Sequence, residues 1–114
     1  MTASIEIEQS RYEPGSAVRG RVTLLFPPGE VELAVLWETE GKGSTDLGVV
    51  FHRVLQSVLE SGDEHSFETT LPLLPLTYDG HLLKIAWRVR VRFLGGVLGQ
   101  DTVVDRDFVV AWPT

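Results

Sequence analysis

The residue types that most often carry chemistry are present in this chain, but their spacing does not suit catalysis or metal binding. His52, His65 and His81 do not form the His-x-x-x-His pattern that places two imidazoles on one metal ion. No Gly-x-Ser-x-Gly turn presents a serine nucleophile. The sequence contains no cysteine, so it has no thiolate nucleophile or metal ligand. These residues predict no catalytic site and no metal site, and we expect the protein not to be an enzyme.

Two other groups could suggest a bound ligand. The glycine-rich segment 95–99 has the composition of a phosphate loop, but such a loop needs a helix N-terminus behind it, and a strand pattern follows here. Asp101, Asp105 and Asp107 could suggest calcium. The last two alternate with apolar residues, however, and lack the enclosing loop of a calcium site. We therefore expect no cofactor.

Basic residues are concentrated on one short segment, which is the clearest candidate for a binding surface. Arg88, Arg90 and Arg92 occur at every second position. Together with Lys42, from a glycine-flanked loop, they form the candidate partner surface, which could bind an acidic protein. In the other interpretation, the arginines pair with acidic residues of a neighbouring strand. The sequence leaves both interpretations open.

Composition limits the partners and the compartment. The net charge of -6 argues against nucleic acid and against an anionic membrane, both of which attract basic surfaces. No signal peptide begins the sequence, and no apolar run is long enough to span a membrane. The absence of cysteine fits a reducing environment. We expect a cytoplasmic protein that binds other proteins, with no nucleic-acid partner and no membrane insertion.

The elements that carry these residues are predicted to be β-strands. From Lys84 to Leu94 every second residue is apolar, which on a strand places one set of side chains in the core and the arginines in water. Segments 18–26, 31–38 and 102–110 alternate in a similar way. Segments 4–8 and 65–71, together with one ambiguous segment, bring the total to about seven strands.

A hairpin between segments 84–94 and 102–110 has a definite consequence for the arginines. If its loop is centred near residues 97–98, Arg90 lies opposite Asp105 and Arg88 lies opposite Asp107. Such cross-strand pairs of opposite charge contribute about 0.2–1 kcal/mol each.

The segment from Leu47 to Leu59 can be a strand or a helix. Its apolar residues fit helical spacing, whereas its four valines favour a strand. We predict a strand, because a lone helix would interrupt an otherwise antiparallel meander.

Frequent turn signals indicate how the strands are arranged. Pairs such as Pro14-Gly15 and Asp79-Gly80 separate the short apolar stretches, which is typical of an all-β, immunoglobulin-like antiparallel sandwich with two sheets. Pro72 to Gly80 is predicted to carry the chain from one sheet to the other, because prolines cannot continue a hydrogen-bonded ladder. Gly20, inside a strand, predicts a bulge or a close approach of two backbones. The length predicts one domain over residues 1–114.

Three stretches, in this order, resemble the N-terminal arrestin domain. Residues 12–22 correspond to its Tyr-x-Pro-Gly opening. Residues 62–80 correspond to its Leu-Pro…Pro-(Ser/Thr)-aromatic-x-Gly run, and residues 85–91 to the strand that follows. The chain is therefore similar to an arrestin-like domain, in a single-domain version of bacterial type. Arrestins proper have two such domains, and the lysine pair with which they sense phosphate is missing from segment 5–8.

The resemblance implies a protein-interaction module: an adaptor, a scaffold or a subunit of a larger assembly. Because a sandwich leaves edge strands unpaired, its sheet edges and loops are the expected contact surfaces. A homodimer built through sheet edges is compatible with this function. The alternative is a sandwich that binds a small ligand, such as a carbohydrate or a lipid headgroup.

Overall fold

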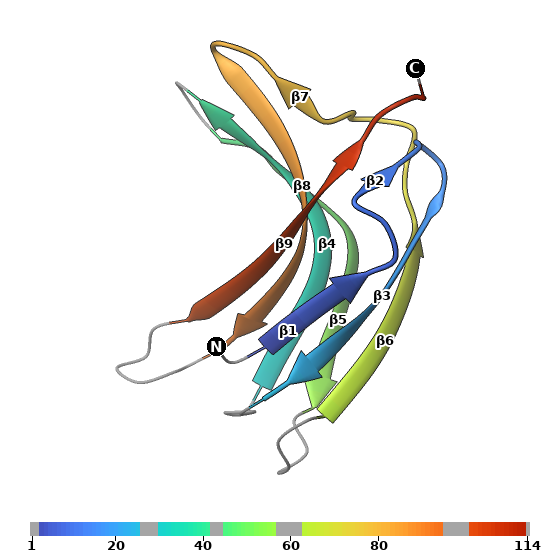
Figure 1. The fold of residues 1–114 in the computed structure, drawn as a ribbon. Coiled ribbons are helices and arrows are strands. Elements are labelled where there is room, and N and C mark those ends of the chain that lie inside the picture. Colours follow the sequence, from blue (N-terminus) through green and yellow to red (C-terminus); the bar gives the residue numbers. More distant parts are fainter. Residues whose placement is uncertain (1–2, 26–29, 42–44, 57–62, 95–100, 114) are drawn as a thin grey trace.

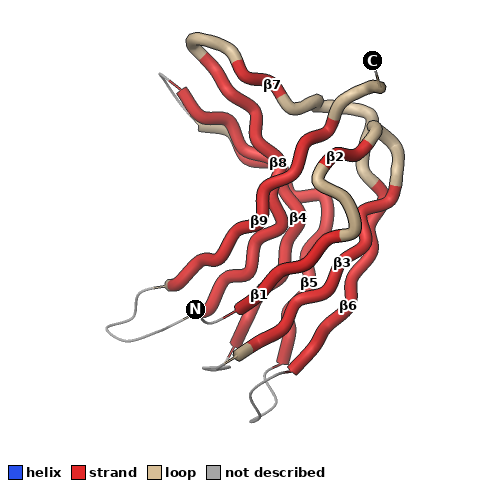
Figure 2. The backbone as a smooth tube through the Cα atoms, in the orientation of Figure 1, coloured by secondary structure: helices blue, strands red, loops and turns tan. Residues whose placement is uncertain are grey.

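The computed structural model describes residues 3–25, 30–41, 45–56, 63–94 and 101–113, and every regular element among them is a β-strand (Figures 1 and 2). The strands form two sheets packed together, which confirms the predicted all-β sandwich. In chain order they are β1 (Ala3–Ile7), β2 (Arg11–Tyr12), β3 (Ala17–Leu24), β4 (Glu30–Gly41), β5 (Leu47–Gln56), β6 (Asp63–Thr70), β7 (Tyr78–Asp79), β8 (Leu83–Phe93) and β9 (Thr102–Val110).

The predicted strands correspond to the seven long ones, and the structure adds two strands of two residues each. One sheet has the order β1-β3-β6 with antiparallel pairing throughout. The other has the order β2-β9-β8-β4-β5, with β7 added beside β8. The short strand β2 runs parallel to the end of β9, a pairing that the sequence did not predict.

The core lies between the two sheets and consists of the apolar sides of the alternating strands. Trp87 is fully buried, and its indole nitrogen donates to the backbone oxygen of Pro75 at 2.9 Å. Trp37 packs against the same core but is only partly buried. The central strands β4 and β8 supply most of the fully buried side chains in the larger sheet: Val31, Leu33, Val35, Trp87, Val89 and Val91.

The crossover predicted for Pro72 to Gly80 is confirmed. The chain leaves β6 in the smaller sheet and reaches β7 in the larger one, across one end of the sandwich (Figure 1). Backbone hydrogen bonds hold both of its ends: Leu71 N–H donates to Ser16 O, and Thr77 N–H donates to Val110 O.

The ambiguous segment is a strand as far as it is described. β5 covers Leu47–Gln56, and residues 57–59 lie outside the described part of the chain. The register with β4 shifts between Val35 and Leu36, where Val50 is an extra residue on β5. This bulge explains the ambiguity in the sequence, because it moves the apolar side chains out of a strict two-residue period.

Gly20 marks the close approach that its position in a strand predicted. A side chain here would place its Cβ 2.5 Å from the backbone oxygen of Glu6 and 2.7 Å from the ring of Phe67. Phe67 lies opposite Gly20 on the paired strand β6, and its ring fills the space that a side chain at residue 20 would need.

Candidate functional site

The arginines of the candidate partner surface lie on the outer face of the larger sheet, where acidic residues from both neighbouring strands surround two of them. The predicted register is confirmed: Arg90 lies opposite Asp105, and Arg88 opposite Asp107. Arg90 Nε and Nη2 donate to the two carboxylate oxygens of Asp105 at 2.8 and 3.1 Å. Arg88 Nε donates to Asp107 at 2.9 Å.

A second set of acids approaches from β4, on the other side of β8. Glu38 accepts hydrogen bonds from both Arg88 and Arg90, and Glu40 accepts one from Arg88. The arginine side chains are only 17% and 15% exposed. The two guanidinium groups thus share four carboxylates within the molecule. An external acidic partner would have to displace these contacts.

The pKa values of both arginines respond to this arrangement. For Arg88, burial by itself lowers the pKa, but hydrogen bonds to Glu40, Asp107 and Glu38 outweigh it, and the pKa is raised. The hydrogen bond to Asp105 is the main reason why the pKa of Arg90 is raised, with burial acting against it. Both side chains therefore remain charged over the physiological pH range.

The other two predicted surface residues differ from this pair. Arg92 is half-buried on the same face, and no ion pair joins it to an acidic side chain in the described ranges. Lys42 lies outside the described residues. That these four residues bind a partner stays a prediction, and Arg92 is the one of the three arginines in this set for which the described part of the chain supplies no ion pair.

The edges of the sheets offer a different kind of surface. Three of the four edge strands are short or charged: β1 has five residues, β6 carries acids such as Glu64 and Glu68, and the part of β9 that β2 leaves uncovered carries Asp105 and Asp107. Charged or short edges resist pairing with another chain. The free edge strand β5 is different, because it is ten residues long and largely apolar.

Arg53 connects the two edges that lie on the same side of the sandwich. Its Nη2 donates to the backbone oxygen of Ser66 on β6 at 2.6 Å. Its guanidinium carbon lies 5.6 Å from the centre of the Phe51 ring, a cation–π distance. Arg53 therefore forms a hydrogen bond with a backbone oxygen at the edge of β6. The backbone groups at the edge of β5 stay accessible.

The hydrogen-bonding pattern shows which backbone groups of β5 are open. Leu94 N–H donates to Glu30 O, so the even-numbered residues of β4 bond to β8 and the odd-numbered ones bond to β5. Thr39 N–H accordingly donates to Asp46 O, on the β5 side. By the register, the β5 residues that turn their N–H and C=O groups to the open edge are Leu47, Val49, His52, Val54 and Gln56.

Three of these five edge residues also expose apolar side chains. Leu47, Val49 and Val54 are 55%, 50% and 46% exposed on the outer face of the larger sheet. His52, between them, lies 3.5 Å from Glu32 through its Nε2 atom. Sequence reasoning did not select these residues. The signal was the excess of valine on both sides of the strand, but only the strand order reveals that the strand is at an edge.

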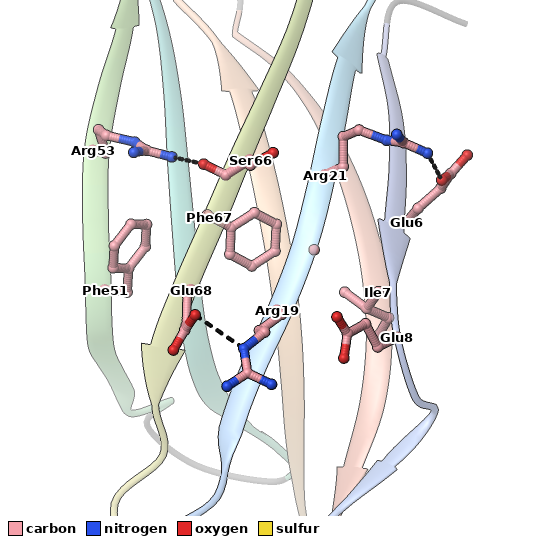
Figure 3. A pocket seen from close by; sticks show the side chains of 11 residues that line it. Glu6, Ile7, Glu8, Arg19, Arg21, Phe51, Arg53, Ser66, Phe67 and Glu68 are labelled. Atoms are coloured by element: carbon pink, nitrogen blue, oxygen red, sulfur yellow. Dashed lines mark hydrogen bonds and ion pairs between the residues drawn. The ribbon is translucent and has the colours of Figure 1, made fainter.

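A shallow cavity of about 670 Å³ lies beside the smaller sheet and is also lined by Phe51 and Arg53 of β5 (Figure 3). Two rows of exposed ion pairs border it: Arg21 with Glu6 at 2.8 Å, and Arg19 with Glu68 at 3.0 Å. Gly20, between Arg19 and Arg21 in the chain, also lines the cavity. Each of these four charged side chains already has a partner within the sheet, and the small-ligand alternative, for which this cavity is the natural location, stays a prediction.

The other chemical candidates remain apart in the fold. His52 is on β5, His65 is on β6 and His81 is in the turn before β8. Within the described ranges, no three His, Cys, Asp or Glu residues are grouped to hold a metal ion. Nor do those ranges contain a helix with the length and hydropathy needed to cross a bilayer.

Comparison with known proteins establishes a likeness in fold. No family model matches the sequence, and no curated protein matches it. The crystal structure of the sporulation control protein Spo0M from Bacillus subtilis is similar, with a TM-score of 0.64 and 19% sequence identity over 98% of this chain. Spo0M has an arrestin-like fold, which supports the resemblance found in the sequence at the level of fold alone. This chain matches 49% of the Spo0M chain, about half its length.

Proposed function

We propose that this chain is a non-catalytic protein-interaction module, an adaptor or scaffold, which binds an extended segment of a partner protein along the free edge of β5. The observation that carries the proposal is the contrast between the four sheet edges. β5 is long and largely apolar, and five of its residues direct their backbone N–H and C=O groups outward. An extended segment that pairs with such an edge satisfies these groups, which is the principle of β-augmentation.

Side chains next to the open backbone groups favour an apolar segment. A strand added to β5 would place alternate side chains beside Leu47, Val49 and Val54, each about half exposed in the free protein. Burial of the remaining apolar surface contributes on the order of 1 kcal/mol for each side chain. Specificity would come from these contacts, and affinity from the backbone ladder.

The arginines support this function from within the sheet. Because Arg88 and Arg90 bond to acids on both β4 and β9, they connect three neighbouring strands of the larger sheet. These contacts stiffen the larger sheet, of which β5 is the edge strand. Arg92 has no ion pair among the residues that the structure describes, and it is proposed as an additional contact.

The test compares two edges of the same sheet. Val54 on β5 and Val103 on β9 are both valines on the outer face, with exposures of 46% and 43%. Immobilised wild-type protein, Val54→Lys and Val103→Lys are used to capture proteins from a lysate of the native cell, and the captured proteins are quantified by mass spectrometry. We expect the partner to be lost with Val54→Lys and kept with Val103→Lys.

A second measurement reports on the binding mode itself. The amide protons of Leu47, Val49, His52, Val54 and Gln56 point away from β4 and should exchange rapidly in the free protein. On binding of the captured partner, these amides should become protected, with alternate residues along β5 unchanged. Equal capture by both lysine variants, or no change in these amides on binding, would refute the proposed function.

A further inference from the structure

The inner side of β5 carries side chains that would contact a segment bound along its edge. Phe51 and Arg53 lie on the side of β5 that faces β6 (Figure 3). Their own backbone groups bond to β4, where they pair with Val35 and Leu33. A strand added antiparallel to β5 would meet both residues in non-hydrogen-bonded pairs, whose Cα atoms lie about 4.5 Å apart with the side chains close together. Two side chains of the segment, separated by one residue, must therefore point inward beside Phe51 and Arg53.

The guanidinium group of Arg53 has donors left for a carboxylate. Its Nη2 donates to the backbone oxygen of Ser66 at 2.6 Å, and no acidic side chain in the described ranges pairs with it. The acids that flank Ser66 on β6 pair with arginines of β3 instead, at N–O distances of 3.0 Å for Glu68 and 3.9 Å for Glu64. Because a guanidinium group has five N–H donors, a carboxylate can bind Arg53 without displacing Ser66.

Next to Arg53, the same side of β5 presents an apolar surface with open space beside it. The rings of Phe51 and Phe67 lie 6.2 Å apart, and both line the cavity of about 670 Å³. Phe67 is buried, whereas Phe51 is only partly buried. A large apolar side chain placed opposite Phe51 would cover the exposed part of this ring and enter the cavity.

We infer that the segment bound along β5 carries a carboxylate opposite Arg53 and, two residues further on, a large apolar side chain opposite Phe51; this inference rests on the proposed function of the β5 edge. The long strands of the larger sheet pair antiparallel throughout, and we expect the segment to do the same. It then meets residue 53 before residue 51, so its sequence reads acidic residue, any residue, large apolar residue. The part of β5 after the bulge, residues 51–56, is regular and spans this whole motif.

Three labelled peptides test the carboxylate. The first is Lys-Thr-Val-Glu-Val-Phe-Thr-Lys, and the others have glutamine or lysine in place of the glutamate. Fluorescence anisotropy measures their Kd values for the full chain. We expect the glutamate peptide to bind about fivefold more tightly than the glutamine peptide, and the lysine peptide to bind most weakly. The formal charge of -6 would by itself favour the lysine peptide, so a preference for glutamate reports on Arg53.

The apolar position is tested with a fourth peptide, in which serine replaces the phenylalanine. It should bind about fivefold more weakly than the first peptide, because it leaves the ring of Phe51 uncovered. Equal Kd values for these two peptides would overturn the apolar half of the motif.

Variants of the protein test whether Arg53 is the group that selects the carboxylate. Arg53→Glu should reverse the order, so that the lysine peptide binds most tightly. Arg53→Gln keeps a donor for the oxygen of Ser66 and should bind the glutamate and glutamine peptides equally, within about twofold. Arg106→Glu, on β9, changes the net charge as much as Arg53→Glu does and should keep the wild-type order. Thermal unfolding confirms that each variant is folded.

The outcomes separate this inference from the proposed function. If the glutamine peptide binds the wild-type protein as tightly as the glutamate peptide and still protects the amides of His52 and Val54, the β5 edge binds a segment but the inference is wrong. An unchanged order in Arg53→Glu, or no binding by any of the peptides, also overturns the inference. The proposed function is then decided independently by capture with Val54→Lys and Val103→Lys.

Discussion

Arg90 and Asp105 face each other across the β8–β9 ladder and are joined by two parallel hydrogen bonds of 2.8 and 3.1 Å. Such a bidentate contact holds both side chains in one geometry. Glu38, on the opposite side of β8, accepts a third hydrogen bond from the same guanidinium group at 2.8 Å. The pair is thus part of a network that joins three strands, and most of our predictions about stability concern such contacts between strands.

Removal of Arg90 should destabilise the fold more than removal of Arg92. Arg90→Ala removes both hydrogen bonds to Asp105 and one of the two arginine donors to Glu38, and we expect it to lower the free energy of unfolding by about 1.5–3 kcal/mol. Arg92→Ala, two residues along the same face, should change it by about 0.5 kcal/mol or less. Urea unfolding followed by circular dichroism measures both values. Equal losses in the two variants would contradict the importance of the network.

Substitution of Arg88 by lysine should create a new pH dependence. Because the folded pKa of Arg88 is raised, its contribution is present below its ordinary pKa and would be lost only as pH rises through the higher folded value. A lysine contributes in the same way, but from an ordinary pKa of about 10.4. The difference in unfolding free energy between wild type and Arg88→Lys should stay constant from about pH 7 to about pH 9 and widen above about pH 10. A difference that narrows there would contradict this explanation.

Gly20 should not tolerate a side chain. The Cβ of Gly20→Ala would meet both the Glu6 backbone and the Phe67 ring, and such overpacking costs about 1–3 kcal/mol. Thr23→Val, on the outer side of the same strand, should change stability by about 0.5 kcal/mol or less. Thermal unfolding measures both variants, and a Gly20→Ala protein as stable as Thr23→Val would show that the strands can move apart there.

Loss of the Arg53 side chain should expose the edge of β6. Arg53→Met keeps an unbranched apolar side chain but removes the donor to Ser66 O, so the variant should aggregate faster during mild heating. Arg106→Met, on the opposite edge strand β9, removes the same charge and is the matched control. Light scattering below the unfolding temperature measures the rates. Equal rates would mean that the charge, and not the contact with Ser66, limits aggregation.

The sequence was sufficient to predict the sandwich and the register of one hairpin. Alternation in segment 84–94 reports directly which side of a strand is buried, and the short loop after it constrains which residues face Asp105 and Asp107. Such local patterns survive in the fold because each strand of the sandwich has one buried side.

The remaining features depend on relationships that no local pattern encodes. Glu38 and Glu40 reach Arg88 because β4 lies beside β8, about fifty residues away in the sequence. Strands of two residues, such as β2, are too short to show a period. That β5 is an edge strand follows from the strand order, and its outward backbone groups follow from the hydrogen bonds of β4. For this reason the candidate edge could be found only in the structure.

The parallel pairing of β2 with β9 has a consequence for the time at which this protein can fold. It joins residues 11–12 to residues 109–110, and Tyr12 packs edge-on against Phe108 with ring centres 5.5 Å apart. A chain that emerges from the ribosome cannot complete this part of its core until residue 110 has been released. The early strands must therefore wait, partly exposed, until residue 110 has emerged, and this part of the core assembles late.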